Sequence, residues 1–97
     1  MTDQKEASAR LWFLYVLRTR TGILYTGISI DVTRRILEHE SGQGAKSLRG
    51  KGPLTLEYSI EVGNRSRAQR LEAAVKKLTR AQKEALIAQD LPLPEID

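Results

Sequence analysis

The sequence contains no cysteine, which excludes disulfide bonds, thiolate metal sites and thiol nucleophiles. This absence fits a reducing, intracellular setting. No apolar run is long enough to cross a membrane, and the polar first ten residues lack the apolar core of a secretory signal. The chain has 97 residues, of which 40% are hydrophobic, and this suffices for one compact core. We therefore expect one soluble, cytoplasmic domain.

Positive charge is concentrated in the middle of the chain. Between Arg34 and Lys83 there are twelve Lys or Arg residues against five acidic residues, and the net charge is +4. This bias suits a polyanionic partner such as nucleic acid. An ordinary basic surface would have the same composition, so charge alone leaves both interpretations open.

The first half of the chain predicts a β-hairpin followed by a helix. Leu11–Leu17 is a short, continuous apolar run typical of a buried central strand, and Ile23–Ile28 reads as its partner across a polar turn. Asp31 is a candidate N-cap for a helix over Val32–Ser41, and Gly42 stands where a helix commonly ends. The glycine-rich segment 41–53 that follows predicts a surface loop.

The second half predicts one strand and two helices. Leu54–Glu61 alternates apolar and polar residues, which predicts a half-buried strand with Leu54, Leu56, Tyr58 and Ile60 on its covered face. Asn64 or Ser66 opens the next helix, where Ser66 and Gln69 have capping-box spacing, and the apolar stripe is Ala68, Leu71, Val75 and Leu78. Thr79 and Gln82 repeat that spacing and predict a last helix to about Gln89.

These elements predict an α+β fold in which a small three-stranded sheet is flanked by helices, in the order β-β-α-β-α-α. We expect a flexible N-terminus over residues 1–10, one domain over 11–89 and a flexible tail over 90–97 that contains Pro92 and Pro94.

Five residues with polar or ionisable side chains lie on these predicted elements. Tyr15 lies in Leu14-Tyr15-Val16, and Tyr25 follows ten residues later in Tyr25-Thr26-Gly27; Arg35 comes ten residues after that, then His39, then Glu72 in the next predicted helix. In this order and spacing they resemble the GIY-YIG nuclease superfamily, which includes nuclease domains of excision repair, structure-specific resolvases and homing endonucleases. The tripeptides read LYV and YTG here instead of GIY and YIG. The chain resembles most the small stand-alone bacterial domains of the UPF0213 type.

The resemblance implies a divalent-metal-dependent endonuclease that hydrolyses phosphodiester bonds in DNA, selects its substrate by structure and acts in repair or recombination. It implies that Glu72 holds Mg²⁺ or Mn²⁺, whose hard-ligand preference a carboxylate suits. With one carboxylate, the metal should bind weakly and be largely absent from the free protein. Tyr15, Tyr25, Arg35 and His39 would be catalytic. DNA is preferred over RNA through the resemblance alone.

The chemistry of these residue types fits that reaction. Arg35 would contact the scissile phosphate through its planar fork of donors. A tyrosine acting with His39 would take the proton from water, which requires nearby positive charge to lower the pKa of the tyrosine. The sequence does not decide between Tyr15 and Tyr25 as the base.

A helical wheel separates the two adjacent arginines. With Val32 at zero and about 100° per residue, Arg35 and His39 border the buried stripe, whereas Arg34 and Glu38 fall on the opposite face. We therefore expect Arg35 to face a cleft and Arg34 to form an exposed pair with Glu38.

Each candidate also has an ordinary structural interpretation. The tyrosines could be core residues with satisfied hydroxyls, His39 a helix-end histidine and Arg35 a surface residue. Glu72 could simply pair with Lys76 one helical turn later. The coincidence of all five in this order favours the functional interpretation.

Further cations are expected to neutralise flanking phosphates: Lys46, Arg49, Lys51, Arg65, Arg67 and Arg70. The loop cations could instead only solubilise a flexible segment. No basic helix has the pattern of a base-reading element, so we expect little sequence preference. Because larger relatives carry separate targeting domains, we expect a partner protein to bring this domain to its target. The alternative is a nucleic-acid-binding module that keeps the fold without turnover.

Overall fold

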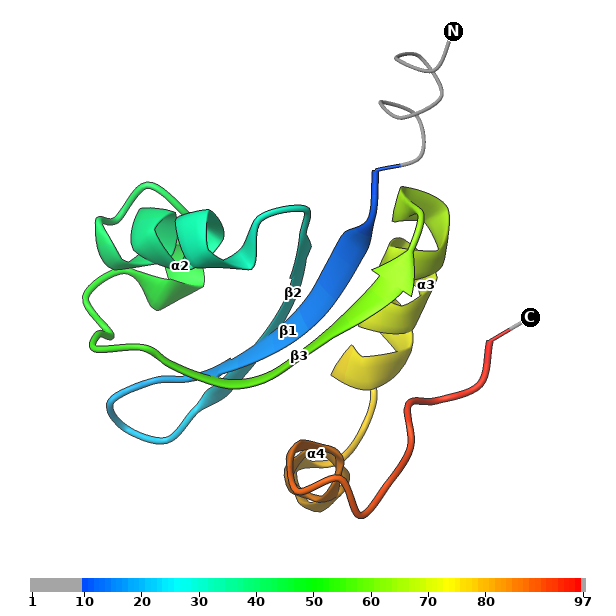
Figure 1. Cartoon of the computed structure of the whole chain (residues 1–97). Helices are drawn as coiled ribbons and strands as arrows, with labels where there is room; N and C mark the ends of the chain where they lie inside the picture. The colour runs from blue at the N-terminus through cyan, green and yellow to red at the C-terminus, as the bar shows by residue number, and fades with distance from the viewer. Residues whose placement is uncertain (1–9, 97) are drawn as a thin grey trace, which may run out of the picture.

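The computed structural model describes residues 10–96, so the predicted flexible segment 1–10 lies almost wholly outside the described residues. The three strands β1 (Trp12–Arg18), β2 (Leu24–Ser29) and β3 (Thr55–Gly63) form one antiparallel sheet in the order β2-β1-β3 (Figure 1). β1 is central because its side chains are the most apolar of the three, and Leu14–Leu17 are buried on both faces of the sheet.

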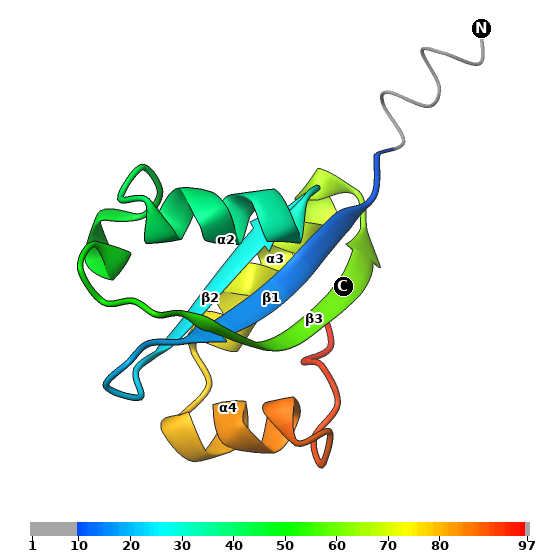
Figure 2. The same cartoon turned by 60° about the vertical axis from the view of Figure 1, so that its left-hand side comes forward.

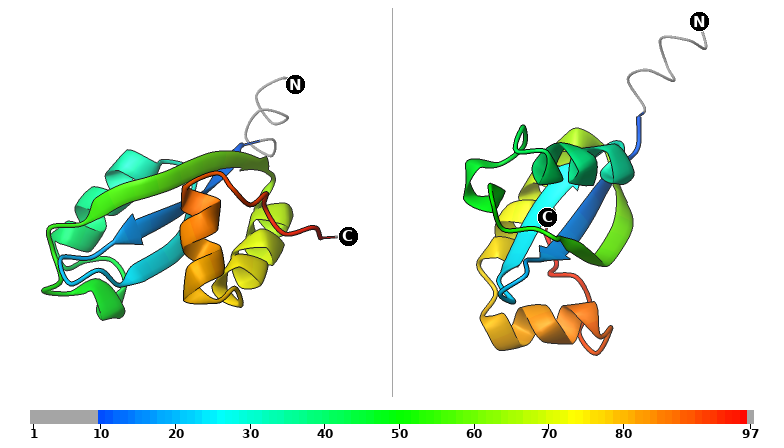
Figure 3. Two further views of the ribbon diagram at one scale, coloured as in Figure 1. Left: turned by 90° about the horizontal axis from the view of Figure 1, so that it is seen from below. Right: turned by 90° about the vertical axis from the view of Figure 1, so that its left-hand side faces the viewer.

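Helices cover both faces of this sheet. Helix α2 (Val32–Glu40) lies on one face, and α3 (Arg65–Lys76) and α4 (Arg80–Ile87) lie on the other (Figures 1 and 2). Leu14 and Val16 join the core beneath α3 and α4, whereas Tyr15 and Leu17 join the core beneath α2, as the alternation of a strand requires. The predicted α+β fold and element order are confirmed, and Figure 3 shows the layers from two further directions.

Local capping chemistry fixes the helix ends. The Asp31 side chain accepts a hydrogen bond from the Arg34 backbone N–H, and Gly42 has φ +88° just after α2, both as predicted. The predicted capping box of Thr79 and Gln82 is also present. The capping box predicted at Ser66 is wrong, because Asn64 caps α3 by accepting from the Arg67 backbone N–H.

The last helix is shorter than predicted. It ends at Ile87, and Gln89 adopts φ +64°, which a continuing α-helix does not allow. Beyond it, Leu93 and Ile96 pack against the core beneath α3 and α4, so the apolar packing extends past residue 89.

The alternation predicted for the third strand is wrong in part. Leu56 and Ile60 are 45% and 38% exposed, whereas Leu54 and Tyr58 contact the cores on opposite faces of the sheet. The cause is an irregularity in the pairing of β1 with β3 between Val16 and Leu17, which breaks the two-residue repeat. The position of β3 at the edge of the sheet leaves its side chains less covered than those of β1.

The glycine-rich segment is mostly loop, as predicted, but it contains a short 3₁₀ helix, η1 (Lys46–Leu48). Leu48 inserts into the core beneath α2 and anchors the loop there. Within residues 10–96, no helix has the length and apolar character needed to cross a membrane.

Candidate active site

Tyr15 lies at the centre of the site. It is fully buried in the middle of β1 and pairs with Gly27 of β2. Its ring lies across Gly27 so closely that a Cβ atom at position 27 would stand 2.5 Å from Tyr15 Cζ. The glycine of the second motif is therefore required by packing: only a residue without a side chain leaves room for this ring.

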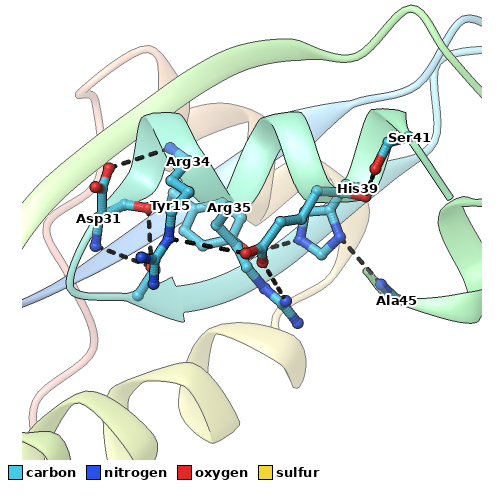
Figure 4. Close-up of polar contacts among 9 residues, drawn as sticks. Tyr15, Asp31, Arg34, Arg35, His39, Ser41 and Ala45 are labelled. Atoms are coloured by element: carbon cyan, nitrogen blue, oxygen red, sulfur yellow. Dashed lines mark hydrogen bonds and ion pairs between the residues drawn. The ribbon is translucent and has the colours of Figure 1, made fainter. Parts of the chain in front are cut away.

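His39 holds the Tyr15 hydroxyl from the last turn of α2. Its Nε2 lies 2.9 Å from Tyr15 Oη, and its Nδ1 accepts a hydrogen bond of 3.1 Å from the Ala45 backbone N–H (Figure 4). Because Nδ1 accepts, the proton of the neutral ring is on Nε2, which donates to Tyr15. Burial and, secondly, the charge of Arg35 lower the pKa of His39 below its usual 6.5, and this favours the neutral ring.

The loop after α2 closes tightly over His39. A Cβ atom at Gly44 would lie 2.9 Å from His39 Cα and closer still to the imidazole ring. Gly44 therefore allows the loop backbone to reach the ring and place the Ala45 N–H against it.

Tyr25 completes an aromatic group with Tyr15 and His39. It pairs with Leu17 across the β1–β2 ladder, which places it on the same face as Tyr15. Its ring centroid is 6.4 Å from that of Tyr15 and 5.4 Å from that of His39, in an edge-on arrangement with the latter. Tyr25 is partly exposed, so it forms the solvent-facing side of the group.

Arg35 reaches the same hydroxyl from the middle of α2. Its charge and its side-chain hydrogen bonding both act on Tyr15, and its Nη1 donates to Glu38 Oε1 at 2.9 Å. The predicted exposed pair of Arg34 and Glu38 is present, with 3.8 Å between Arg34 Nε and Glu38 Oε2. The wheel did not predict that Glu38 also contacts Arg35.

Glu72 approaches from α3, on the opposite face of the sheet. It is mostly buried, and its Oε2 lies 3.4 Å from Lys76 Nζ, which is the pairing that the ordinary structural interpretation predicts. Its negative charge also contributes to raising the pKa of Tyr15, so the carboxylate is near the site. The other four residues thus act on the hydroxyl group of Tyr15.

The pKa of Tyr15 is raised to about 12, mainly by burial and then by the neighbouring Tyr25. Arg35 lowers it, in the predicted direction, but burial outweighs this effect. In the protein alone, Tyr15 is therefore a weaker acid than free tyrosine, and Arg35 by itself does not supply the positive charge that a tyrosine base requires.

The donor set suits a weakly held hard cation. Residues 10–96 contain no group of three or more His, Asp or Glu side chains placed to hold a metal ion. Glu72 would therefore supply one carboxylate, and water and substrate oxygens would fill the remaining positions. This chemistry fits magnesium or manganese at low affinity.

The six predicted phosphate-binding cations do not form one continuous group. Lys46, Arg49 and Lys51 belong to the loop after α2, where Arg49 Nε donates to the Gly42 carbonyl at 3.0 Å. On α3, Arg65 stacks over Trp12, with its Cζ 5.7 Å from the ring centroid. About 100° per residue places Arg65 near Glu72 on the helix circumference, but Arg70 roughly 160° away from it. Arg67 lies about 60° from Arg70 and about 160° from Arg65, so Arg67 and Arg70 share one side of the helix and Arg65 lies on the other.

The site also contains contacts that the sequence analysis missed. The pairing of Glu38 with Arg34 was predicted, but its contact with Arg35 was not, although their three-residue separation is also a spacing of helical ion pairs. A single sequence carries no pattern that indicates the close approaches at Gly27 and Gly44 or the hydrogen bond from the Ala45 backbone.

The chain is similar to known proteins over most of its length. The model of the GIY-YIG catalytic domain matches residues 11–85. The chain is 56% identical over 85 residues to the UPF0213 protein YhbQ of Escherichia coli O127:H6, covering 88% of this chain and 85% of that protein. It is 58% identical over 85 residues to a UPF0213 protein of Sodalis glossinidius, covering 87% and 79%.

Two solved structures are similar as well. The solution structure of the UPF0213 protein BH0048 from Bacillus halodurans matches with a TM-score of 0.54 and 39% identity, covering 84% of this chain and 87% of that one. The protein EF2693 from E. faecalis matches with a TM-score of 0.59 and 36% identity, covering 90% and 92%.

Proposed function

Because the chain belongs to the GIY-YIG family, we propose that it is a metal-dependent endonuclease that hydrolyses phosphodiester bonds in DNA. The family's catalytic domain implies a nucleic-acid substrate in general. Selection of DNA by its structure, with little sequence preference, and a role in repair or recombination are parts of the proposal.

The observation that carries the proposal is the convergence on the Tyr15 hydroxyl. His39 donates to it, Arg35 acts on it by charge and hydrogen bonding, and Glu72 lies near it from the opposite face of the sheet. Phosphodiester hydrolysis needs an activated water and stabilisation of charge on the phosphate oxygens. The phenol and its hydrogen-bond donors would serve to activate the water, and the arginine and the carboxylate with its metal ion would stabilise the charge.

Each residue has a role that its surroundings support. The Arg35 fork would bind the non-bridging oxygens of the scissile phosphate. A divalent ion on Glu72 would stabilise the negative charge that develops on the phosphate and the leaving oxygen. His39, as the Nε2–H tautomer, would hold the Tyr15 hydroxyl in place rather than accept its proton, because Nδ1 is engaged by Ala45.

A tyrosine would take the proton from the attacking water. Tyr15 keeps its own proton up to about pH 12 in the protein alone, so its use as a base requires more positive charge than Arg35 supplies. Its hydroxyl is surrounded by donors from His39 and Arg35, which favour the phenolate once it forms. Tyr25, at the exposed side of the group, is the other candidate.

The proposal is tested by cleavage of single-stranded, duplex and branched DNA in the presence of magnesium or manganese. Wild type should cut at least one of these, and Arg35→Ala and Glu72→Ala should cut it about 10²–10³-fold more slowly, the loss typical for removing one transition-state contact. If wild type cuts none, or both variants cut as fast as wild type, the proposed activity is wrong.

The second candidate is a nucleic-acid-binding module without turnover. The raised pKa of Tyr15 favours it, because the buried phenol keeps its proton and Nδ1 of His39, the basic atom of the neutral ring, already accepts from the Ala45 backbone N–H. Salt-dependent DNA binding without cleavage in any metal would support this module.

A further inference from the structure

Glu38 lies between two adjacent arginines on the exposed side of α2. Its Oε1 accepts from Arg35 Nη1 at 2.9 Å, and its Oε2 lies 3.8 Å from Arg34 Nε. The two oxygens thus each face one guanidinium group. The side chains of Glu38, Arg35 and Arg34 are 36%, 39% and 69% exposed, so solvent reaches all three.

We propose that Arg34 and Arg35 form a binding site for one phosphate group of the nucleic-acid backbone, and that the Glu38 carboxylate occupies this site in the free protein. A phosphodiester has the features that Glu38 presents here, a negative charge shared by two oxygens, of which one accepts a hydrogen bond from Arg35 and the other pairs with the charge of Arg34. The inference rests on the proposed nucleic-acid substrate and adds Arg34 to the residues that bind it.

Replacement of the Glu38 carboxylate by a phosphate group requires little free energy. Exposed ion pairs one helical turn apart contribute little to stability, so Glu38 can leave at little cost. An arginine binds phosphate through two parallel hydrogen bonds, which the long contact of 3.8 Å between Arg34 Nε and Glu38 Oε2 does not provide. Glu38 then acts as an internal competitor that lowers the affinity of the site for every polyanion.

The location links this site to the proposed chemistry. Arg35 contacts Glu38 on its exposed side and acts on the Tyr15 hydroxyl on its buried side. A phosphate that replaces Glu38 would therefore be held next to the hydroxyl group at the centre of the site. Arg35 would then contact the substrate phosphate and act on the Tyr15 hydroxyl at the same time.

The test is the binding of a fluorescein-labelled DNA strand, measured by fluorescence anisotropy in EDTA so that no cleavage occurs. Glu38→Gln removes the competing charge and should tighten binding about three- to fivefold, the size expected for one exposed ion pair. The slope of log affinity against log salt should also steepen by about 0.7–0.9, one additional phosphate contact. Glu95→Gln, in the exposed tail, changes the net charge equally and is the matched control.

Arg34→Gln distinguishes local binding from a general charge effect. Arg34→Gln should weaken DNA binding more in the Glu38→Gln background than in wild type, because Arg34 has no competing carboxylate in that background and binds phosphate. Titration with pyrophosphate should shift the Nε–H signals of Arg34 and Arg35 in NMR spectra, and more so for Glu38→Gln.

The inference is overturned if Glu38→Gln and Glu95→Gln change affinity and salt slope equally, or if the pyrophosphate shifts are absent from both arginines. Because no step of this test requires turnover, a wild type that cuts nothing would refute the endonuclease and leave the phosphate site standing. A wild type that cuts, together with equal binding by the two glutamine variants, would refute the phosphate site alone.

Discussion

Replacing Gly27 with alanine should displace Tyr15 from the site. The added Cβ would lie 2.5 Å from Tyr15 Cζ and 3.0 Å from Cε1, and the ring is fully buried beside β2. Neither the β2 backbone nor the ring can move without disturbing the β1–β2 ladder or the hydrogen bond to His39. Overpacking of this kind costs about 1–3 kcal/mol.

In a domain of this size, each kcal/mol lowers the melting temperature by about 4–8 °C. Urea and thermal unfolding, followed by the fluorescence of the single tryptophan, measure the cost. The control is Gly52→Ala, where the nearest heavy atom beyond the two neighbouring residues of the chain would lie 4.0 Å from the added Cβ. A glycine-to-alanine change without a clash is neutral or stabilises by about 0.4–1 kcal/mol.

A double-mutant cycle tests whether the free-energy cost of Gly27→Ala arises from the Tyr15 ring. In a Tyr15→Ala background the clash is gone, so Gly27→Ala should cost less than about 0.5 kcal/mol, which leaves a coupling energy above about 1 kcal/mol. If Gly27→Ala behaves like Gly52→Ala, or costs the same with and without the Tyr15 ring, the packing explanation of the motif glycine is wrong.

Three further predictions concern titration. The pKa of His39 is lowered in the folded state, so the unfolded state binds more protons as the pH drops below about 6.5. The free energy of unfolding should therefore fall below this pH, and His39→Gln should remove this pH dependence in unfolding experiments. The pKa of Tyr15 is raised, so an absorbance titration should show that Tyr15 keeps its proton until about pH 12, and this step should be lost in Tyr15→Phe. The free energy of unfolding should fall as the pH rises above 10, because Tyr15 ionises first in the unfolded state. Arg18 holds Glu84 by two hydrogen bonds of 2.8 Å and, with Arg80, lowers the pKa of that carboxyl to about 2. Arg18→Ala should return the Glu84 pKa towards 4.5 in an NMR titration, and an unchanged value would contradict this pairing.

The sequence predicted those features that depend on periodicity and capping. The apolar run of β1, the Asp31 cap and the Thr79 capping box each follow from a local pattern, and each is present. The separation of Arg34 from Arg35 followed from helical geometry alone, and Arg35 is indeed the less exposed of the two.

The features that failed depend on tertiary context. The alternation of β3 predicts one covered face, but its irregular pairing with β1 exposes Leu56. Two caps compete at the start of α3, and Asn64 prevails over Ser66. The apolar run around Tyr15 predicted its burial, but the sequence did not reveal that burial would outweigh the charge of Arg35 in setting the pKa of Tyr15.

Glu72 provides the most direct test of the proposed active site, because its two interpretations predict opposite results. The measurement is the single-turnover rate of magnesium-dependent DNA cleavage by Glu72→Gln and by Lys76→Gln, which break the same 3.4 Å ion pair from either side. If Glu72 holds the metal, Glu72→Gln should slow cleavage about 10²-fold or more, whereas Lys76→Gln should cleave at the wild-type rate or faster. Equal rates for the two variants would mean that Glu72 serves only the ion pair and would contradict the proposed site.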